Sequence, residues 1–434
     1  MFGRPLLRTS YSQDAAIFPT AFQKGAFVAL LIGLVLMGLG NSVFAWLPEF
    51  LFGGTWLNPV TNMLPLAIAA LGFNILLGVT GQVSLGHAFF MGVGAYTAVC
   101  LGGEGKGGAK ACIPFHEQMG ILDERGQCGL GLPIWIWLPM AGIAATLVGI
   151  AVSPAAVKVR GLYLAIVTIG LVFIGLHLGR MLPEYAGDFE SGRTWPSLDI
   201  TIWDSENPLV SMTSDGTWFG LIYLTEEQKQ FFFLLAILVV AAFVSKNIIR
   251  SRTGRALQAI RDRDIAAEVM GVPEFKYKMM GFAISSFYAG IGGALFASYN
   301  GRVSPIQFNL FLSVDFVAIL LIGGAGTIIG TMLGSVFVEL TPEAVKTFTE
   351  WLGDQTSASG PIGWFANFLV TEGPDDFGFI SLAASSPGWP MSVFFWNFVI
   401  FGVLIIVFMI FEPLGLYGIW AKIRNYWKRW PFSY

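Results

Sequence analysis

The sequence is poor in charged residues and in the residue types that usually carry catalysis or bind metals. Only 12% of its 434 residues are charged, and it contains three cysteines and three histidines. The histidines are His87, His116 and His177, which lack the spacing of metal ligands and have no carboxylate cluster near them in the apolar segments. We therefore expect neither a metal site nor a catalytic site in this chain.

A nucleotide-binding loop is also missing from the sequence. No GxxxxGK[ST] motif occurs, because the GGEGKG stretch at 102–107 has the wrong spacing and no Ser or Thr after its lysine. Acids and histidines that would carry a proton or sodium current are almost absent from the middle of the apolar segments. The net charge of −3 gives no reason to expect a nucleic-acid partner. We expect that ATP, if it is used, is hydrolysed by a separate subunit.

Apolar residues, by contrast, are abundant and occur in long runs. Hydrophobic residues make up 55% of the chain, and its mean hydropathy is +0.67. Runs long enough to span a bilayer lie at roughly 26–46, 62–79, 84–101, 133–153, 161–180, 230–247, 279–298, 312–340 and 391–412. They predict an all-α polytopic membrane protein with about eight to ten transmembrane helices, some of them short or broken. We expect the first run to be a retained helix and not a cleavable targeting signal.

Lysine and arginine are concentrated in particular connections between these runs. They precede the first run, follow the last one and are densest between 246 and 278. Since cytoplasmic segments are rich in these residues, both termini are predicted to be cytoplasmic. The predicted parts are a cytoplasmic N-terminal segment at 1–25, a transmembrane domain at 26–340, an acidic extracytoplasmic insertion at 341–390, a final transmembrane helix at 391–412 and a basic cytoplasmic tail at 413–434. The acidic segment 181–229 is predicted to lie outside as well.

The run 312–340 must enter and leave the membrane on the outer face if the insertion after it lies outside. This requires a bend at Gly323, Gly324 and Gly326, and we predict a hairpin of short helices. Non-helical backbone at membrane depth is tolerated where protein or a water-filled cavity covers it, so the bend suggests an element that lines a pathway. One long tilted helix is the alternative from sequence alone.

The external loop 102–132 contains two of the three cysteines. A disulfide between Cys112 and Cys128 would close this loop. Cys100, at the end of a predicted helix, is either a competing partner or a small buried residue, and the sequence does not choose.

Two stretches of the sequence resemble each other. GQVSLGHAFF at 81–90 and GRVSPIQFNL at 301–310 share Gly, Val and Ser at the same offsets, and each follows an apolar helix. The topology places the first stretch at a cytoplasmic helix end and the second at an external one, which is the pattern of an inverted repeat. Chance similarity between two glycine-rich turns is the alternative.

These stretches also hold polar residues at the edges of apolar helices, where they are costly unless paired or facing a cavity. The candidates for a translocation path are Asn74, Gln82, Ser84, His87, Ser304, Pro305 and Asp315. Each has a structural alternative. His87 would simply bond a nearby carbonyl, and Asp315 would reach the membrane interface or cap its helix.

The cytoplasmic segment 251–272 interleaves apolar and charged residues in the pattern of an amphipathic helix pair. Such a segment can fill the groove of a partner while its charges pair at the rim. Its candidate docking residues are Gly254, Arg255, Ala256, Ile260, Arg261, Asp262, Ile265, Ala266, Ala267 and Gly271. The alternative is an ordinary charged cytoplasmic loop that needs no partner.

GQVSLGHAFFMGVGAY at 81–96 and GRALQAIRDRDIAAEVMG at 254–271 resemble the two signature stretches of the branched-chain amino acid permeases of ABC importers, the LivM/LivH type. The likeness runs in order from about 60 to 340 and is closer to the LivM branch. In ABC importers the coupling helix carries an acidic residue, two alanines, three variable positions and a glycine. Ala266, Ala267 and Gly271 fit that pattern, but Ile265 occupies the acidic position.

The resemblance implies a multi-pass permease subunit of the prokaryotic plasma membrane that works by alternating access. It implies a second homologous permease, two ATP-binding cassettes that carry ATP and Mg²⁺, and an extracytoplasmic binding protein, with no cofactor in this chain. Leucine, isoleucine and valine are the expected substrates, with urea or short amides as the alternative, because the outer insertions look longer than is usual in the family. A stand-alone carrier or channel is the alternative of a different class, and it would transport without partners.

Overall fold

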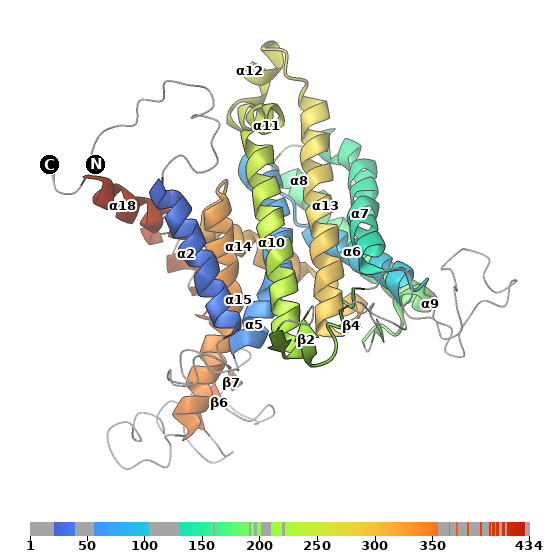
Figure 1. Ribbon diagram of the computed structural model, residues 1–434. Coiled ribbons are helices and arrows are strands. Elements are labelled where there is room, and N and C mark those ends of the chain that lie inside the picture. The colour runs from blue at the N-terminus through green and yellow to red at the C-terminus, as the bar shows by residue number, and fades with distance from the viewer. Residues whose placement is uncertain are drawn as a thin grey trace, which may run out of the picture.

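The computed structural model describes residues 21–39, 56–103 and 130–354, apart from short gaps at 159–160, 191, 195–197, 201–209 and 219–221, with short stretches within 364–412 and residues 415–429. Helices dominate this part of the chain and run roughly side by side in one bundle (Figure 1). Six of them are long and apolar enough to cross a membrane, and three shorter apolar helices accompany them. The prediction of an all-α polytopic membrane protein is confirmed.

Two antiparallel helices form the centre of the bundle. The first is α5 (Leu57–Phe73), which continues as a π-helix, η2 (Asn74–Val79), and the second is α13 (Glu274–Asn300). At one end the Tyr299 hydroxyl donates to the Asn58 carbonyl at 3.1 Å. At the other end Gly281 lies against Thr80. Of the residues in the apolar window of the span 57–79, 89% are buried, as expected for a helix enclosed by others.

Glycines of α13 let its neighbours approach closely. These neighbours are α6 (His87–Gly102) and α7 (Ile134–Lys158). A β-carbon on Gly293 would lie 2.1 Å from the Met91 carbonyl oxygen of α6, and one on Gly290 would lie 2.7 Å from the Ala141 carbonyl oxygen of α7. Small residues at such contacts are the usual means of helix association in membranes, where dispersion contacts replace the hydrophobic effect.

The remaining long helices cover this centre and keep much of their surface outward. They are α2 (Ala21–Gly38), α8 (Leu162–Met181), α10 (Glu226–Arg250), α14 (Leu310–Gly323) and α15 (Ile328–Asp354). The spans in α8, α10 and α15 are only 22–28% buried. Among the described residues, their apolar side chains are therefore available to lipid or to another subunit.

Short elements lie at the end of the bundle that the charge pattern places outside. Here β1 (Arg193–Thr194) pairs antiparallel with β4 (Arg302–Val303), which precedes the 3-10 helix η4 (Pro305–Phe308). The other elements in these segments are α9 (Pro183–Ala186), β2 (Gly216–Trp218) paired with β3 (Ile222–Leu224), and a parallel sheet of β5 (Val370–Thr371), β6 (Ile380–Ser381) and β7 (Met391–Ser392). The β1–β4 pair attaches the acidic segment 181–229 to the end of α13.

The two similar stretches adopt similar backbones. Gly81 and Gly301 end the antiparallel helices α5–η2 and α13 with φ of +75° and +76°, a region that favours glycine. In each case an interruption of the α-helix follows and leads into a shorter helix, α6 or α14; the interruption before α14 includes β4 and the 3-10 helix η4. The amide of Ala88 in α6 donates to the Ser313 hydroxyl in α14 at 3.1 Å, so the two shorter helices meet. The antiparallel helices and the shared glycine conformation are features that the predicted inverted repeat requires.

The predicted bend in the run 312–340 is also present. α14 ends at Gly323, and Gly324 and Gly326 turn the chain with φ of +110° and +83° before α15 begins. The alternative of one long tilted helix is therefore wrong, because these two glycines have conformations that no helix contains. The second arm of the hairpin is longer than expected, since α15 continues to Asp354. Cys112 and Cys128 lie outside the described residues, and the run 391–412 is described only in part.

We expect Gly293→Ala to lower the free energy of unfolding by about 1–3 kcal/mol, because its β-carbon would overlap the Met91 carbonyl of α6. Gly170→Ala in α8 is the matched control, since no atom lies within 4 Å of its added β-carbon. Thermal unfolding of the two purified variants in detergent measures the difference. Equal stability of both variants would contradict the close α6–α13 contact.

Candidate functional site

The predicted docking segment forms two short helices at the end of the bundle that the charge pattern assigns to the cytoplasm (Figure 1). They are α11 (Arg252–Asp262) and α12 (Asp264–Val269). The Ser251 side chain caps α11 by accepting from the Gly254 amide at 3.3 Å. Arg263 lies between the helices in an extended conformation, with φ of −157°, and so turns α12 away from the line of α11.

The two helices face in different directions. α11 buries Leu257 and Ile260 in the chain, whereas α12 leaves Val269 and Met270 82% and 83% exposed. Ile265 is 69% exposed as well. The apolar surface available to a partner is therefore that of α12, while α11 belongs to the bundle.

Some of the predicted docking residues are buried and others are exposed. Ile260 and Gly254 are buried, and a β-carbon on Gly254 would lie 2.2 Å from the Ile249 carbonyl oxygen, so neither reaches a partner from this position. Ala256 is half-buried and Ala267 buried. The exposed members of the set are Arg255, Arg261, Asp262, Ile265, Ala266 and Gly271.

Gly271 ends α12 in the left-handed conformation, with φ of +85°. The Val272 amide donates to the Ala267 carbonyl and the Gly271 amide to the Glu268 carbonyl, both at 2.9 Å. These two bonds form a Schellman motif, in which glycine is the favoured residue. The glycine of the family pattern thus has a physical role, because it stops α12 and sends the chain into α13.

Arg261 connects α11 to the broken end of the central helix. Its Nη1 donates to the Gly78 carbonyl oxygen of η2 at 2.7 Å, and its Nε and Nη2 donate to Asp262 Oδ1 at 3.2 Å. A β-carbon on Gly81 would lie 2.8 Å from Arg261 Cγ, so the arginine side chain needs glycine at this position. The guanidinium supplies a donor to one of the last carbonyls of a helix, where a positive charge is also favoured.

The turn between α14 and α15 reaches the same place. The Gly326 amide donates to Asn74 Oδ1 at 2.7 Å. A β-carbon on Gly78 would lie 2.3 Å from the Gly326 nitrogen, and one on Gly326 would lie 3.4 Å from Arg261 Nη1. We call the group of Arg261, Gly78, Asn74 and Gly326 the junction. It brings together the docking segment and one broken element from each half of the inverted repeat.

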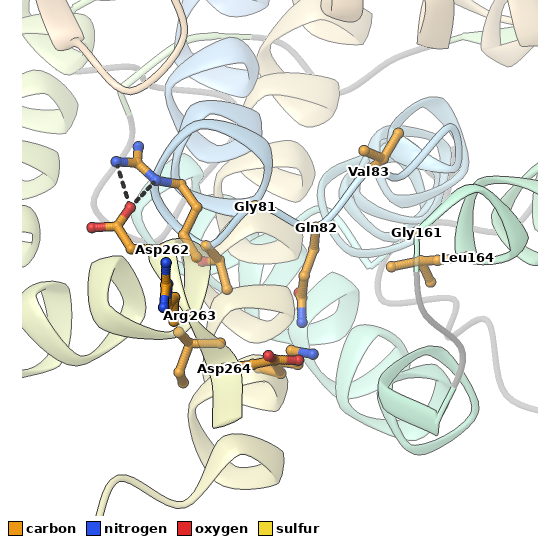
Figure 2. Close-up of a pocket in the computed structure, with 12 residues that line it drawn as sticks. Gly81, Gln82, Val83, Gly161, Leu164, Asp262, Arg263 and Asp264 are labelled. Carbon is orange, nitrogen blue, oxygen red and sulfur yellow. Dashed lines mark hydrogen bonds and ion pairs between the residues drawn. The ribbon is translucent and has the colours of Figure 1, made fainter. Parts of the chain in front are cut away.

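A cavity of about 250 Å³ lies beside the junction, between residues 80–83, the start of α8 and residues 260–264 (Figure 2). Gln82 lines it with a side chain that is 5% exposed, and neither atom of its amide has a hydrogen-bond partner among the described residues. The Nδ2 atom of Asn74 is likewise buried without a partner. A buried unpaired polar group costs about 1–3 kcal/mol, so Gln82 and the Asn74 Nδ2 atom are the polar groups beside the junction that still need a partner.

The non-helical stretch 81–86 is buried at Gln82, Ser84 and Gly86 and exposed at Gly81 and Val83, and side chains of α8 and of the stretch itself bond its backbone. The Leu85 amide donates to Thr168 Oγ1 of α8 at 2.9 Å, and the Gly86 amide donates to Ser84 Oγ at 3.3 Å. His87 follows, and its Nε2 donates to the Ala69 carbonyl at 3.0 Å. His87 therefore bonds a nearby carbonyl, as the structural alternative for this residue predicted. Ser84 and His87 are both 1% exposed.

The other predicted path residues lie toward the opposite end of the bundle. Ser304 forms a capping box with Gln307 at the start of η4, and Pro305 packs against Gly179 of α8. Asn309 caps α14 by accepting from the Leu312 amide at 3.2 Å, so the interpretation of Asp315 as the cap is wrong. Asp315 lies within the electrostatic reach of Glu339 on α15, an acid that the sequence analysis missed.

Together, the inverted helices, the broken elements and the junction define an α-helical, multi-pass membrane protein of the transporter class. The sequence matches the family model described as "Branched-chain amino acid transport system / permease component" over residues 56–409. The chain therefore belongs to this family, whose members are multi-pass proteins of the bacterial inner membrane.

Individual relatives agree with the family match. The chain is 30% identical over 341 residues to the high-affinity branched-chain amino acid permease LivM of Escherichia coli K12, covering 76% of this chain and 71% of the relative. It is 29% identical over 326 residues to LivM of Salmonella typhimurium, covering 73% and 69%. A shorter match, 28% over 134 residues, links it to the nucleoside permease NupC of Lactococcus lactis, covering 30% and 40%. No solved structure matches the chain significantly.

We expect Asn74→Ala to lower the free energy of unfolding by about 1–3 kcal/mol, because it leaves the Gly326 amide without an acceptor. Asn247→Ala is the control, since Asn247 is exposed on α10 and should change stability by less than about 0.5 kcal/mol. Thermal unfolding in detergent compares the two variants. If Asn74→Ala is as stable as its control, the Asn74–Gly326 bond does not hold the junction together.

Proposed function

We propose that this chain is a permease subunit of an ATP-driven ABC importer for leucine, isoleucine and valine. It pairs with a second, homologous permease. The two subunits form the translocation path, which opens alternately to each side of the membrane. Two cassette subunits carry the ATP and Mg²⁺, and an extracytoplasmic binding protein delivers the substrate. The family and the LivM relatives support this assignment, and the junction is the observation that gives it a mechanism.

The exposed surface of α12 is the proposed contact with a cassette. Ile265, Val269 and Met270 project outward from a short helix whose base is fixed by buried residues of α11. An apolar face of this kind fits a groove on a partner, with exposed charges such as Arg255 at the rim. A cassette that grips α12 therefore moves α11 with it.

The junction is the proposed route from that movement to the path. Arg261 is carried by α11 and bonds the end of η2, while Asn74 in η2 bonds the turn after α14. A shift of α11 changes the positions of both broken elements at once. Packed elements of this kind switch between discrete arrangements, and the unpaired amides of Asn74 and Gln82 would gain partners in the second arrangement.

The relatives support the proposed substrate class, and the path itself needs no tight site if affinity resides in the binding protein. Uptake into proteoliposomes tests the proposal directly. The vesicles contain this chain, its partner permease and cassettes, with the binding protein outside and ATP inside. We expect uptake of labelled leucine that stops when the cassettes are omitted. Uptake of urea instead would change the substrate class, and leucine uptake by this chain alone would contradict the permease assignment.

We expect Arg261→Gln to lower the number of solutes imported per ATP hydrolysed by roughly tenfold, because a charge-assisted hydrogen bond contributes about 1.5 kcal/mol or more. Cassette binding should persist, since Arg261 is not part of the apolar face of α12. Arg261→Lys should recover part of the coupling, because a lysine can still donate to the Gly78 carbonyl. Parallel assays of uptake and ATP hydrolysis measure this ratio.

Arg252→Gln is the matched control, because Arg252 lies exposed on the same helix and the charge change is the same. We expect it to keep the native ratio. A native ratio in Arg261→Gln as well would show that the junction does not transmit the movement.

A further inference from the structure

The last described helix, α18 (Gly415–Arg429), has a composition unlike that of the other helices. Its sequence GLYGIWAKIRNYWKR contains four basic residues and no acidic one. It also contains two tryptophans and two tyrosines, the side chains that concentrate at membrane–water interfaces. None of the functions proposed above for α11, α12 or the junction involves this helix.

The apolar side chains of α18 are exposed on one side. Ile419, Trp420, Ile423 and Tyr426 are 40%, 44%, 47% and 66% exposed. Their spacing of one, four and seven residues places them on a single face of an α-helix. Lys422, three residues after Ile419 and four before Tyr426, lies at the edge of this face, is exposed, and pairs with Glu412 at 2.5 Å. The exposed part of this apolar face favours a surface of low polarity.

The position of α18 indicates what that partner is. It begins directly after the last apolar run, 391–412, and it lies across the direction of α10 and α13, not along it (Figure 1). The run 391–412 is the predicted final transmembrane helix, and a helix that follows such a span and turns across the bundle is expected at the level of the lipid headgroups. Basic residues beside an apolar face then meet phosphates while the apolar side chains enter the acyl region.

We propose that α18 is an interfacial helix that binds the anionic lipid headgroups of the cytoplasmic leaflet. Ile419, Ile423 and Tyr426 insert between lipids, and the net positive charge of the helix sequence draws it to the phosphates. A protein partner is disfavoured by the composition, because four cations with no acid match a uniformly anionic surface better than a mixed protein surface.

The attachment of α18 gives this contact a mechanical consequence. Gly415, with φ of +65°, starts the helix against the turn after α14. A β-carbon on it would lie 2.5 Å from the Ile322 carbonyl oxygen and 2.8 Å from the Gly324 nitrogen. This turn also carries Gly326 of the junction, so lipid binding by α18 fixes one of the elements that has to move during transport.

Spin labels on the full-length chain, reconstituted in vesicles with its partner subunits, test the proposal. Cys100, Cys112 and Cys128 are first replaced by serine, and a single cysteine is then placed at Ile423, Tyr426 or Lys422. In vesicles with anionic phosphatidylglycerol, labels at Ile423 and Tyr426 should collide with oxygen more than with a water-soluble nickel chelate. The label at Lys422 should show the reverse. Labels at Ile423 and Tyr426 that both reagents fail to reach would instead place this face on another protein and overturn the proposal.

Lipid charge is the second arm of the same experiment. In vesicles of neutral phosphatidylcholine, or at high salt, the Ile423 label should shift toward the water-exposed value of Lys422, because the basic side chains lose their counterions. Lys422→Gln combined with Arg424→Gln should produce the same shift in anionic vesicles. Identical values in neutral and anionic vesicles would contradict the binding of anionic headgroups.

Discussion

The requirement that every backbone group inside a membrane has a hydrogen-bond partner governs this structure. Both halves of the chain contain a helix that stops and restarts within the protein, and each stop exposes carbonyls and amides that lipid cannot satisfy. Arg261 donates to a carbonyl at the end of η2, and Asn74 accepts a hydrogen bond from an amide in the turn after α14. Thr168 and Ser313 do the same for the stretch that leads into α6. The breaks are therefore held by side chains from elements far apart in the sequence.

This arrangement connects stability with transport. A continuous helix satisfies its own backbone and has no reason to respond to its neighbours, whereas a broken helix depends on the segments that complete it. The docking segment supplies one of those completing side chains, so its position and the position of the broken elements are linked by a specific bond and not merely by proximity. Glycine packing around α13 keeps the other helices close to it.

The sequence predicted the elements better than their contacts. Hydropathy located the spans, and Gly323, Gly324 and Gly326 located the bend, because the run 312–340 had to turn back to the outer face and glycine accommodates the φ values of a turn. The shared GxVS pattern predicted a repeat, and Gly81 and Gly301 share one conformation, as that prediction requires. The hydrogen-bond partner of Arg261 was not predictable. In the sequence, an arginine of a charged cytoplasmic segment looks the same whether its side chain faces another protein or a carbonyl of its own chain. The role of Asn309 as the cap of α14 was missed in favour of Asp315, because the helix begins earlier than its apolar run. Glu339 was overlooked within a run whose composition was read as uniformly apolar.

The central claim is that Arg261 transmits movement of α11 and α12 to the turn between α14 and α15. The most direct test is the distance between spin labels on Ile329 of α15 and Val244 of α10, both exposed, in the nucleotide-free and ATP-trapped states of the assembled transporter. We predict that this distance changes on ATP binding in the native chain and stays constant in Arg261→Gln. The same change in both chains would show that the turn moves without the Arg261–Gly78 bond.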